Sequence, residues 1–493
     1  MEILIDSLYS IVNYKSRYLK LKEILEGIPV SEYKVIFKSN NNYKPLDLEV
    51  PYDNCFVVLK HPVEIDFNNL AINIVNHTNT KWMFYFRHFD NDKKEDIIVT
   101  PWEVDTMNNG VPIRNVKGRK LLIIKDLCRW TRRTDSGDLR DIWRKDAILI
   151  EDGILQNKPV APYDNSSSAM SYYYYDLGTQ PMILKNLCFK RMDETSNVIG
   201  LVSVCGQDNV IFDNIEVVKN VKNPVSEDKI FDIQESYNVV LSNININDTY
   251  SSEHAYGYAF AFDTITNLSM YNINAYGMWG VMGTNNLNNV LLKDCELNRF
   301  DIHCYGRDVR IINCTFKNEK CKTNNYNQLS SFYGTICFDK CTFINFQPLL
   351  FEPSFHTYTG FNLIMNSCVW QGNTDTATII NAGRLEDNKN VVRRKELTMT
   401  CWPNIYINDL ILEENASTYI LPQQILLFNI REPTTDVLRN VAISHISHIS
   451  VNFHSDKHKP SVKFCNYNVR TESQITTFSS EKDALIIGLE QHY

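Results

Sequence analysis

A nine-residue pattern that recurs ten times between residues 181 and 448 constrains the fold of this chain more than any other feature. The second and fourth positions of each copy are apolar, the sixth is usually Asn or Asp, and the seventh and ninth are apolar again. Alternation with a period of two is typical of a β-strand, and Asn or Asp suits a tight bend because it tolerates left-handed backbone. Each copy therefore predicts two short strands joined at a bend. The copies begin at Pro181, Asn209, Asn238, Asn267, Asn289, Asp308, Thr335, Asn362, Asn404 and Asn440.

A unit this short cannot bury its own apolar face, but stacked copies form a continuous core. Parallel stacking at about 4.8 Å per coil places like residues side by side. The bend residues Asn214, Asn243 and Asn272 are then predicted to share one corner and to form a hydrogen-bonded ladder. A β-sandwich is the alternative, but sandwiches rarely repeat one bend and one interior column in this way. The sequence predicts an all-β fold, a single right-handed parallel β-helix.

A helix over residues 6–27 is predicted ahead of the first strands. Asp6 is placed to cap its N-terminus, and Gly27 and Pro29 are placed to end it. Because the open end of a solenoid invites strand addition, this amphipathic helix is expected to cap the β-helix. Its apolar face consists of Leu8, Ile11, Val12, Tyr18, Leu21, Ile24 and Leu25.

The regularity of the pattern divides the chain. We expect an N-terminal helical cap over residues 1–30 and first coils with irregular insertions over residues 31–180. The regular β-helix is expected over residues 181–432, and C-terminal coils with a terminal β element over residues 433–493. The insertions are expected to belong to early coils and not to a separate domain.

Composition narrows the classes of partner. Hydrophobic residues make up 44% of the chain and charged residues 22%, which is typical of a folded protein. The formal net charge of −8 argues against a nucleic-acid partner, which usually requires a basic surface. No apolar run approaches the ~20 residues that span a bilayer, so no membrane insertion is expected. The N-terminus lacks the features of a signal peptide, and we expect assembly in the cytoplasm.

The thirteen cysteines are interpreted as reduced core residues, because several of them occupy the interior seventh position of the repeat. No Cys-x-x-Cys pair, HExxH helix, EF-hand loop or phosphate-binding glycine loop occurs. The sequence therefore predicts no metal and no cofactor.

Residues 277–316 carry a more specific signal. A Trp-Gly-x-Met-Gly-x-Asn stretch from Trp279 precedes an Arg-Phe-Asp-x-His strand from Arg299. The chain resembles the pectin-lyase-like β-helix superfamily, and this segment is similar to tailspike-type β-helix proteins of phages and prophages. The resemblance implies a homotrimeric virion tail protein, with other tail proteins and bacterial surface polysaccharide as partners, and depolymerisation of that polysaccharide. The alternatives are a non-catalytic structural or receptor-binding tail protein, and a nutritional pectate-lyase-like enzyme, which the missing export signal disfavours.

The alternation of side chains along the strands of this segment predicts which residues could contact a substrate. Alternation predicts that Asp301, His303 and Tyr305 point outward together. An offset of 22 residues between coils places Trp279 beside Asp301, where an exposed indole could stack on a sugar ring. Asp301 and His303 could form an acid/base pair, and Arg299 could neutralise a substrate carboxylate. The alternative is a surface cluster whose members satisfy one another.

Further carboxylates lie on neighbouring coils. Glycoside hydrolysis uses two carboxyl groups, about 5–5.5 Å apart for retention or about 6.5–9.5 Å apart for inversion. Asp263, Asp301 and Glu352 are the candidate partners, with Glu253 and His254 as further binding residues beside Trp279 and Tyr305. A lyase would instead use a base and a cation, for which His303, Arg299 and Tyr305 are candidates. We favour a hydrolase over a lyase, and the alternative for each carboxylate is a solvated surface residue.

Overall fold

The computed structural model describes most of the chain, and the structural statements below concern the residues that it describes. These are residues 1–39, 44–53, 55–77, 82–87, 94–99, 117–133, 140–157, 170–191, 200–219, 229–248, 258–276, 281–317, 326–328, 332–351, 361–382, 404–413, 419–430, 449–454, 460–465, 475–480 and 484–489.

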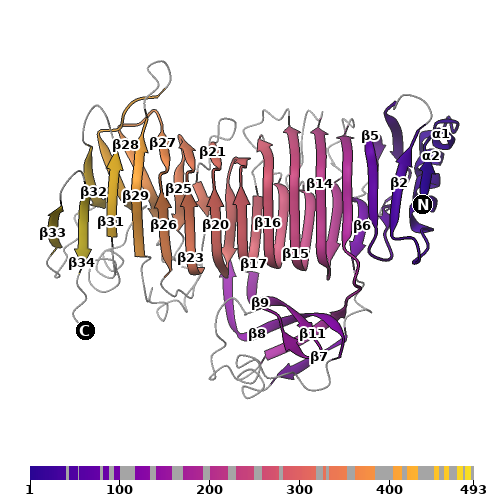
Figure 1. Ribbon diagram of the computed structural model, residues 1–493, viewed down its shortest axis with the longest axis horizontal. Coiled ribbons are helices and arrows are strands. Elements are labelled where there is room, and N and C mark those ends of the chain that lie inside the picture. Colours follow the sequence, from indigo (N-terminus) through magenta and orange to yellow (C-terminus); the bar gives the residue numbers. More distant parts are fainter. Residues whose placement is uncertain are drawn as a thin grey trace.

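The main body is a stack of coils whose strands lie side by side along one long axis (Figure 1). Almost all neighbouring strands in it are parallel, and the described residues form one 24-stranded sheet that winds around the stack. The strands of this sheet are β1 (Glu2–Leu4), β2 (Lys34–Lys38), β3 (Leu46–Val50), β4 (Val57–Val58), β5 (Glu64–His77), β6 (Trp82–Arg87), β12 (Met182–Arg191), β13 (Gly200–Cys205), β14 (Asp208–Lys219), β15 (Lys229–Asp248), β16 (Tyr258–Tyr276), β17 (Val281–Lys293), β18 (Glu296–Leu297), β19 (Phe300–Cys304), β20 (Gly306–Ile312), β21 (Thr315–Lys317), β23 (Phe332–Asp339), β24 (Thr342–Ile344), β26 (Asn362–Asn366), β27 (Val369–Gln371), β29 (Asn404–Leu412), β31 (Ile449–His454), β33 (Ile475–Ser480) and β34 (Ala484–Leu489).

The register of the coils confirms the predicted parallel β-helix. Ile215 pairs with Leu187 on one side and with Ile244 on the other, and Ile244 pairs with Ile273. These side chains are buried in one continuous core. The seventh position of the repeat therefore forms the predicted interior column.

The bends also have the predicted chemistry. Asn186, Asn214, Asn243 and Asn272 all have φ between 50° and 57°, a left-handed conformation that Asn tolerates better than most residues. The Asn214 amide donates to Asn186 Oδ1 at 2.7 Å, and the Asn272 amide donates to Asn243 Oδ1 at 2.9 Å. Stacked amides thus satisfy one another at these two steps. The Asn243 amide instead donates to Asp213 Oδ1 at 2.8 Å, so the predicted ladder is interrupted between Asn214 and Asn243.

The interior cysteines continue the apolar column. Cys295, Cys314, Cys341 and Cys368 are buried and carry free thiols. In the next interior row, the rings of Phe316 and Phe343 stack with centroids 5.7 Å apart. The thiols act here as small core side chains, as the sequence predicts.

A separate five-stranded sheet runs along the C-terminal half of the stack. Its strands pair in parallel and are β22 (Tyr326–Gln328), β25 (Gln347–Phe351), β28 (Thr376–Ala382), β30 (Gln424–Ile430) and β32 (Ser461–Cys465).

The chain leaves the stack after β6 to form a separate five-stranded sheet, and returns at β12. This inserted sheet projects from the side of the stack (Figure 1), and it has a hydrophobic cluster of its own that includes Leu121, Ile123 and Leu149. β12 pairs with β5 and β13 pairs with β6, so the insertion lies between successive coils. Its antiparallel strands are β7 (Lys94–Val99), β8 (Arg119–Arg133), β9 (Arg140–Glu151), β10 (Ile154–Leu155) and β11 (Met170–Asp176).

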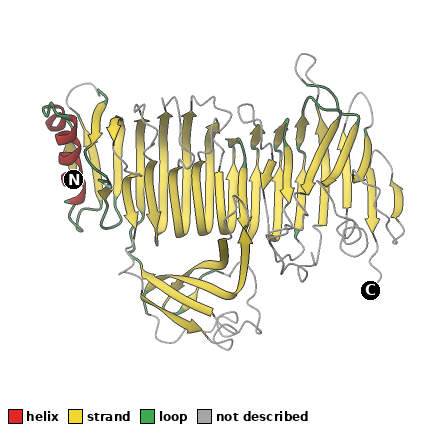
Figure 2. Cartoon of the chain, turned by 180° about the vertical axis from the view of Figure 1, so that it is seen from behind, coloured by secondary structure: helices red, strands yellow, loops and turns green. Residues whose placement is uncertain are grey.

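The N-terminal segment differs from the single helix that the sequence predicts. It forms β1 and two helices, α1 (Asp6–Tyr9) and α2 (Tyr14–Glu26), at one end of the stack (Figure 2). Asn13 breaks the helix, because its side chain accepts a hydrogen bond from the Ser16 backbone and caps α2. Val12, expected on the apolar face, is 88% exposed. Tyr18, Leu21 and Leu25 of α2 are buried, and Gly27 ends the helix.

The last copy of the repeat also differs. Ile405 pairs with Ile449, so β31 stacks on β29 and the coil predicted from Asn440 is out of register. Residue 440 itself lies outside the described residues. Beyond β31, the strands β33 and β34 pair antiparallel.

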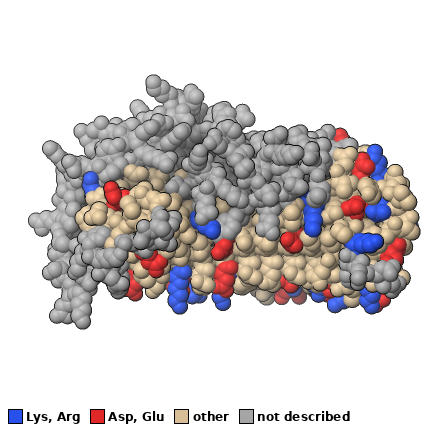
Figure 3. Space-filling view, turned by 90° about the horizontal axis from the view of Figure 1, so that it is seen from above, with Lys and Arg blue, Asp and Glu red and all other residues tan. Residues whose placement is uncertain are grey.

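Charged side chains on the stack pair across coils. Glu64 lies 3.0 Å from the Lys34 ammonium and 2.8 Å from the Lys185 ammonium. On the face shown in Figure 3, the described Lys and Arg residues are interspersed with Asp and Glu along the stack.

Candidate functional site

The structure contradicts the predicted exposure of Asp301, His303 and Tyr305. Asp301 and Tyr305 have no exposed surface, and His303 is 1% exposed. Arg299 is also buried and forms an ion pair with Asp301, while its guanidinium lies 5.5 Å from the centroid of the Tyr326 ring. Alternation gave the correct face of β19, because Phe300 and Ile302 lie in the core, but it could not show that the residues on the other face are buried as well. A polysaccharide cannot reach these groups.

The offset that placed Trp279 beside Asp301 is also wrong. Asp301 pairs with Met282, which corresponds to 19 residues and not 22. The offset of 22 applies one coil earlier, where Asp263 pairs with Asn285 across a bulge. Four other candidates, Trp279, Glu253, His254 and Glu352, lie outside the described residues.

Asp263 is the predicted site residue that the structure places in a polar surface. It belongs to a row of side chains on the outer face of β13, β15, β16 and β17, one from each coil. Along this row Cys205 pairs with Gln234, Gln234 with Asp263, and Asp263 with Asn285. A second row, two residues earlier in each strand, contains Ser203 and Asp232, which also pair.

Asp232 and Asp263 lie close enough to act on the two sides of one glycosidic bond. Gln234 stands two residues after Asp232 on the same strand, and Asp263 is the neighbour of Gln234 on the next coil. Two residues of strand and one coil separate the α-carbons of the two acids by about 8 Å, with both side chains on the outer face. Inverting glycosidases hold their two carboxyl groups about 6.5–9.5 Å apart, and side chains that leave one face from α-carbons at this separation can reach that arrangement.

The two carboxyl groups have different surroundings. Asp232 accepts hydrogen bonds from the Gln234 amide at 3.1 and 3.2 Å and from the Ser203 hydroxyl at 3.2 Å. Asp263 is half-buried and accepts one from Thr264 at 3.0 Å. Burial raises the pKa of Asp263, and the carboxylates of Glu235 and Asp232 add to the shift, while Lys145 and Thr264 oppose it.

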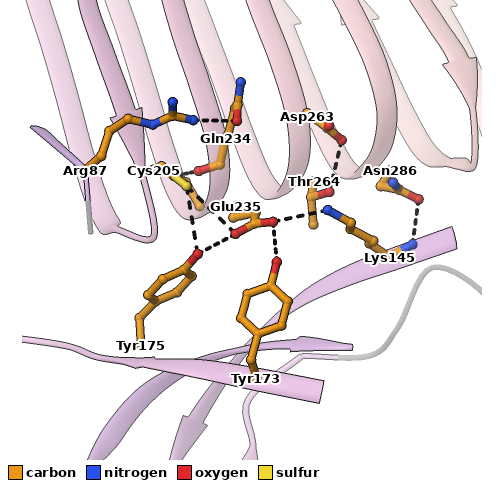
Figure 4. Close-up of polar contacts among 11 residues, drawn as sticks. Arg87, Lys145, Tyr173, Tyr175, Cys205, Gln234, Glu235, Asp263, Thr264 and Asn286 are labelled. Atoms are coloured by element: carbon orange, nitrogen blue, oxygen red, sulfur yellow. Dashed lines mark hydrogen bonds and ion pairs between the residues drawn. The ribbon is translucent and has the colours of Figure 1, made fainter. Parts of the chain in front are cut away.

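Glu235 joins the inserted sheet to the stack next to these acids (Figure 4). Its carboxylate accepts hydrogen bonds from the hydroxyls of Tyr173 and Tyr175 on β11, and it lies 3.2 Å from the Lys145 ammonium on β9. Burial raises the pKa of both tyrosines, so both remain donors. The sulfur of Cys205 also lies beside this carboxylate, 3.8 Å from Oε2 of Glu235.

The backbone at Glu235 is unusual for an acidic residue. Its φ is 45°, and the corresponding bend residues on neighbouring coils are Gly206 with φ 73° and Thr264 with φ 60°. Only glycine adopts this region without cost, and outliers of this kind cluster at functional sites and junctions. The bend therefore aims the Glu235 carboxylate at the inserted sheet while Gln234 and Asp263 remain on the outer face.

Lys145 contributes from the inserted sheet. Burial disfavours its charged form, but the carboxylates of Glu235 and Asp263 outweigh this effect and raise the pKa of Lys145. Its backbone N–H donates to Asn286 Oδ1 at 2.9 Å. The Lys145 ammonium thus lies next to Glu235 and close to the row of side chains that contains Asp263.

Sequence reasoning missed Asp232, Gln234, Glu235 and the partners from the inserted sheet. The signal for the first two was present, because Phe231-Asp232-Ile233-Gln234 and Phe260-Ala261-Phe262-Asp263 show the same alternation immediately before two copies of the repeat. Tyr173 and Tyr175 carried no such signal, since their position depends on how the inserted sheet packs.

No group of three or more His, Cys, Asp or Glu side chains in the described ranges is arranged to hold a metal ion. Within the same ranges, no helix is long and apolar enough to cross a membrane.

Neither a family model nor a curated protein matches the sequence. Among solved structures, the chain is similar to the Gp54 tailspike of Acinetobacter baumannii bacteriophage AP22 in complex with A. baumannii capsular saccharide, with 10% identity over 94% of this chain and 77% of that chain and a TM-score of 0.44. It is also similar to the tailspike protein gp49 from Pseudomonas phage LKA1, with 11% identity over 91% and 72% and a TM-score of 0.49. A third is tailspike protein 3 of bacteriophage CBA120, with 8% identity over 94% and 61% and a TM-score of 0.35.

Proposed function

We propose that this chain is a tailspike-like protein that binds a bacterial surface polysaccharide on the outer face of β13, β15 and β16 and hydrolyses it. The observation that carries the proposal is the pair Asp232 and Asp263, whose α-carbons lie about 8 Å apart on one face and whose carboxyl groups have different surroundings. Paired carboxyl groups whose surroundings separate their pKa values are the usual acid and base of glycoside hydrolysis.

The raised pKa assigns the roles. Asp263, as general acid, donates its proton to the glycosidic oxygen as the bond from that oxygen to the anomeric carbon breaks. Asp232, held as a carboxylate acceptor by Gln234 and Ser203, takes a proton from the water that attacks the anomeric carbon from the opposite side. The sugar gains the hydroxyl, the leaving chain gains a proton, and the anomeric configuration inverts.

The proposal is tested with Asp263→Asn on a panel of capsular and surface polysaccharides, with release of reducing ends as the readout. Loss of a general acid is expected to lower the rate by about 10²–10⁴-fold while leaving glycan binding in place. The matched control is Asp339→Asn, the same change on β23, away from Asp232 and Asp263. Equal rates for wild type and Asp263→Asn would overturn the assignment.

A non-catalytic binding protein is the second candidate. Asp232 is only 6% exposed and accepts hydrogen bonds from two neighbours, as a structural acid does. Under this alternative, wild type binds a glycan of the panel without cleaving it, and Asp263→Asn alters affinity alone.

The resemblance of residues 277–316 to tailspike-type proteins also suggests a place in a virion tail, as a homotrimer beside other tail proteins. Light scattering of the purified chain tests the trimer, with a mass three times that of the monomer as the expected result.

A further inference from the structure

A pocket of about 170 Å³ lies beside the proposed site, where the early coils meet the inserted sheet. Its walls include Val58, Pro62 and Phe86, which are apolar, together with Lys60 and Arg87. The pocket therefore combines apolar walls with two cations.

The cations of this pocket form no direct ion pair, although the nearby Asp232 carboxylate helps to raise the pKa of Arg87. Asp176 also lines the pocket, but it is already paired with Lys120. Neither Lys60 nor Arg87 forms an ion pair with any acid in the described part of the chain. The Arg87 guanidinium is only half-buried, so an anion that enters the pocket can reach it.

Arg87 is held in position without being neutralised. Its guanidinium donates to Gln234 Oε1 at 2.5 Å and lies 5.7 Å from the centroid of the Tyr85 ring. The Tyr85 ring in turn stacks on Phe56, with centroids 4.5 Å apart. The fork of the guanidinium can bind a carboxylate through two parallel hydrogen bonds.

Arg87 connects the pocket to the row of side chains that contains Asp263. Arg87 stands in the same outer row as Asp263, since Arg87 pairs with Cys205, Cys205 with Gln234 and Gln234 with Asp263. Three coils separate the two residues by about 14 Å. Gln234 also links Arg87 to Asp232, because its oxygen accepts from Arg87 and its nitrogen donates to Asp232. Figure 4 shows the contact between Arg87 and Gln234.

We infer that this pocket is the subsite for a carboxylate-bearing sugar, so that the substrate is an acidic polysaccharide lying along the stack from Asp263 toward the early coils. The inference rests on the proposed function. It adds the charge of the substrate and the direction in which the polymer runs.

The test measures binding of D-glucuronate and D-glucose by saturation-transfer NMR to the full chain carrying Asp263→Asn. Glucuronate is expected to bind at least tenfold more tightly than glucose. Arg87→Gln is expected to abolish this preference, and Arg87→Lys to restore part of it, because a lysine keeps the charge but not the fork. Lys60→Gln, at an exposed position, should weaken glucuronate binding by about two- to fivefold. Lys293→Gln is the matched control and should bind as the parent does.

Equal binding of the two sugars, no binding of glucuronate, or an unchanged preference in both Arg87→Gln and Lys60→Gln would overturn the inference. Its failure is distinguishable from failure of the proposed function. Cleavage of a neutral glycan without glucuronate binding removes only the acidic subsite. Glucuronate binding without cleavage of any glycan removes only the hydrolysis.

Discussion

The Tyr175 hydroxyl on the inserted sheet donates a hydrogen bond of 2.5 Å to Oε2 of Glu235 on the parallel stack. Tyr173 donates to the other oxygen, and Lys145 adds a positive charge at 3.2 Å. One buried carboxylate thus connects two strands of the insertion to one coil, directly beside the proposed acid Asp263.

Replacing Glu235 with Gln is expected to loosen this junction. The variant loses the ion pair with Lys145 and places an amide donor against a tyrosine donor, at a cost of about 1–3 kcal/mol. Limited proteolysis should then cleave residues 94–176 faster than the stack. Glu216→Gln, at an exposed glutamate, is the control. Proteolysis of the insertion at the wild-type rate in Glu235→Gln would contradict the role of this carboxylate.

Asp301→Asn is expected to affect stability and not catalysis. Removal of one partner from the buried Arg299–Asp301 pair leaves an uncompensated charge, which typically costs about 3–5 kcal/mol. Urea unfolding measures the loss. The double variant Arg299→Met with Asp301→Leu should recover much of it, because a buried ion pair can often be replaced by apolar side chains. Loss of activity in an Asp301→Asn protein of wild-type stability would show instead that Asp301 is catalytic.

The asparagine corner is expected to depend on backbone conformation as well as on hydrogen bonding. Asn243 has φ 53° and accepts from Asn272 at 2.9 Å. Asn243→Val should lower the free energy of unfolding by about 2–3 kcal/mol, since a β-branched residue is strained there and the hydrogen bond is lost. Asn243→Gly keeps the conformation and should lose only about 1 kcal/mol. Equal losses in the two variants would show that conformation contributes little.

The parts of the fold that depend on local chemistry could be predicted from the sequence. Asn186 and Asn214 mark the bends because few other residues adopt left-handed backbone, and Ile215 and Ile244 share a column because stacking repeats the strand pattern. The inserted sheet could not be predicted, since its antiparallel pairs and its contacts with Glu235 depend on packing between distant segments. The register predicted for the last coil was wrong, because a long connection precedes this coil and the spacing between copies of the repeat cannot be recognised there.

The site was only partly predictable for the same reason. Alternation correctly assigns Asp263 and Asp301 to the outer face of their strands. It does not indicate which outer faces are covered, and Asp301 is fully buried. One partner of Asp263, Lys145, lies more than one hundred residues away in the sequence, and its position required the three-dimensional arrangement.

Asp263 is expected to destabilise the protein at neutral pH. Burial raises the pKa of Asp263 in the folded state above the ordinary value of 3.8, so the folded state holds this proton more tightly than the unfolded chain. The stabilising effect of that proton is complete below pH 3.8 and is lost as the pH rises through the folded pKa. Asp263→Asn should therefore be more stable than wild type at pH 7, and the difference should shrink toward pH 4.

Urea unfolding at a series of pH values measures this difference, and Asp339→Asn on β23 is the control for the substitution itself. A lower stability of Asp263→Asn at pH 7 would contradict the burial of an ionised carboxylate. A gain in stability together with a loss of hydrolysis is the pattern expected of a residue retained for catalysis.

Incubation of the wild-type chain with the glycan panel in ¹⁸O-labelled water, followed by mass spectrometry of the products, tests the central claim most directly. Hydrolysis by the Asp232 and Asp263 pair predicts fragments that carry one ¹⁸O at each new reducing end, and Asp263→Asn should release almost none of them. Unsaturated fragments without ¹⁸O, or labelled fragments released equally by wild type and Asp263→Asn, would contradict it.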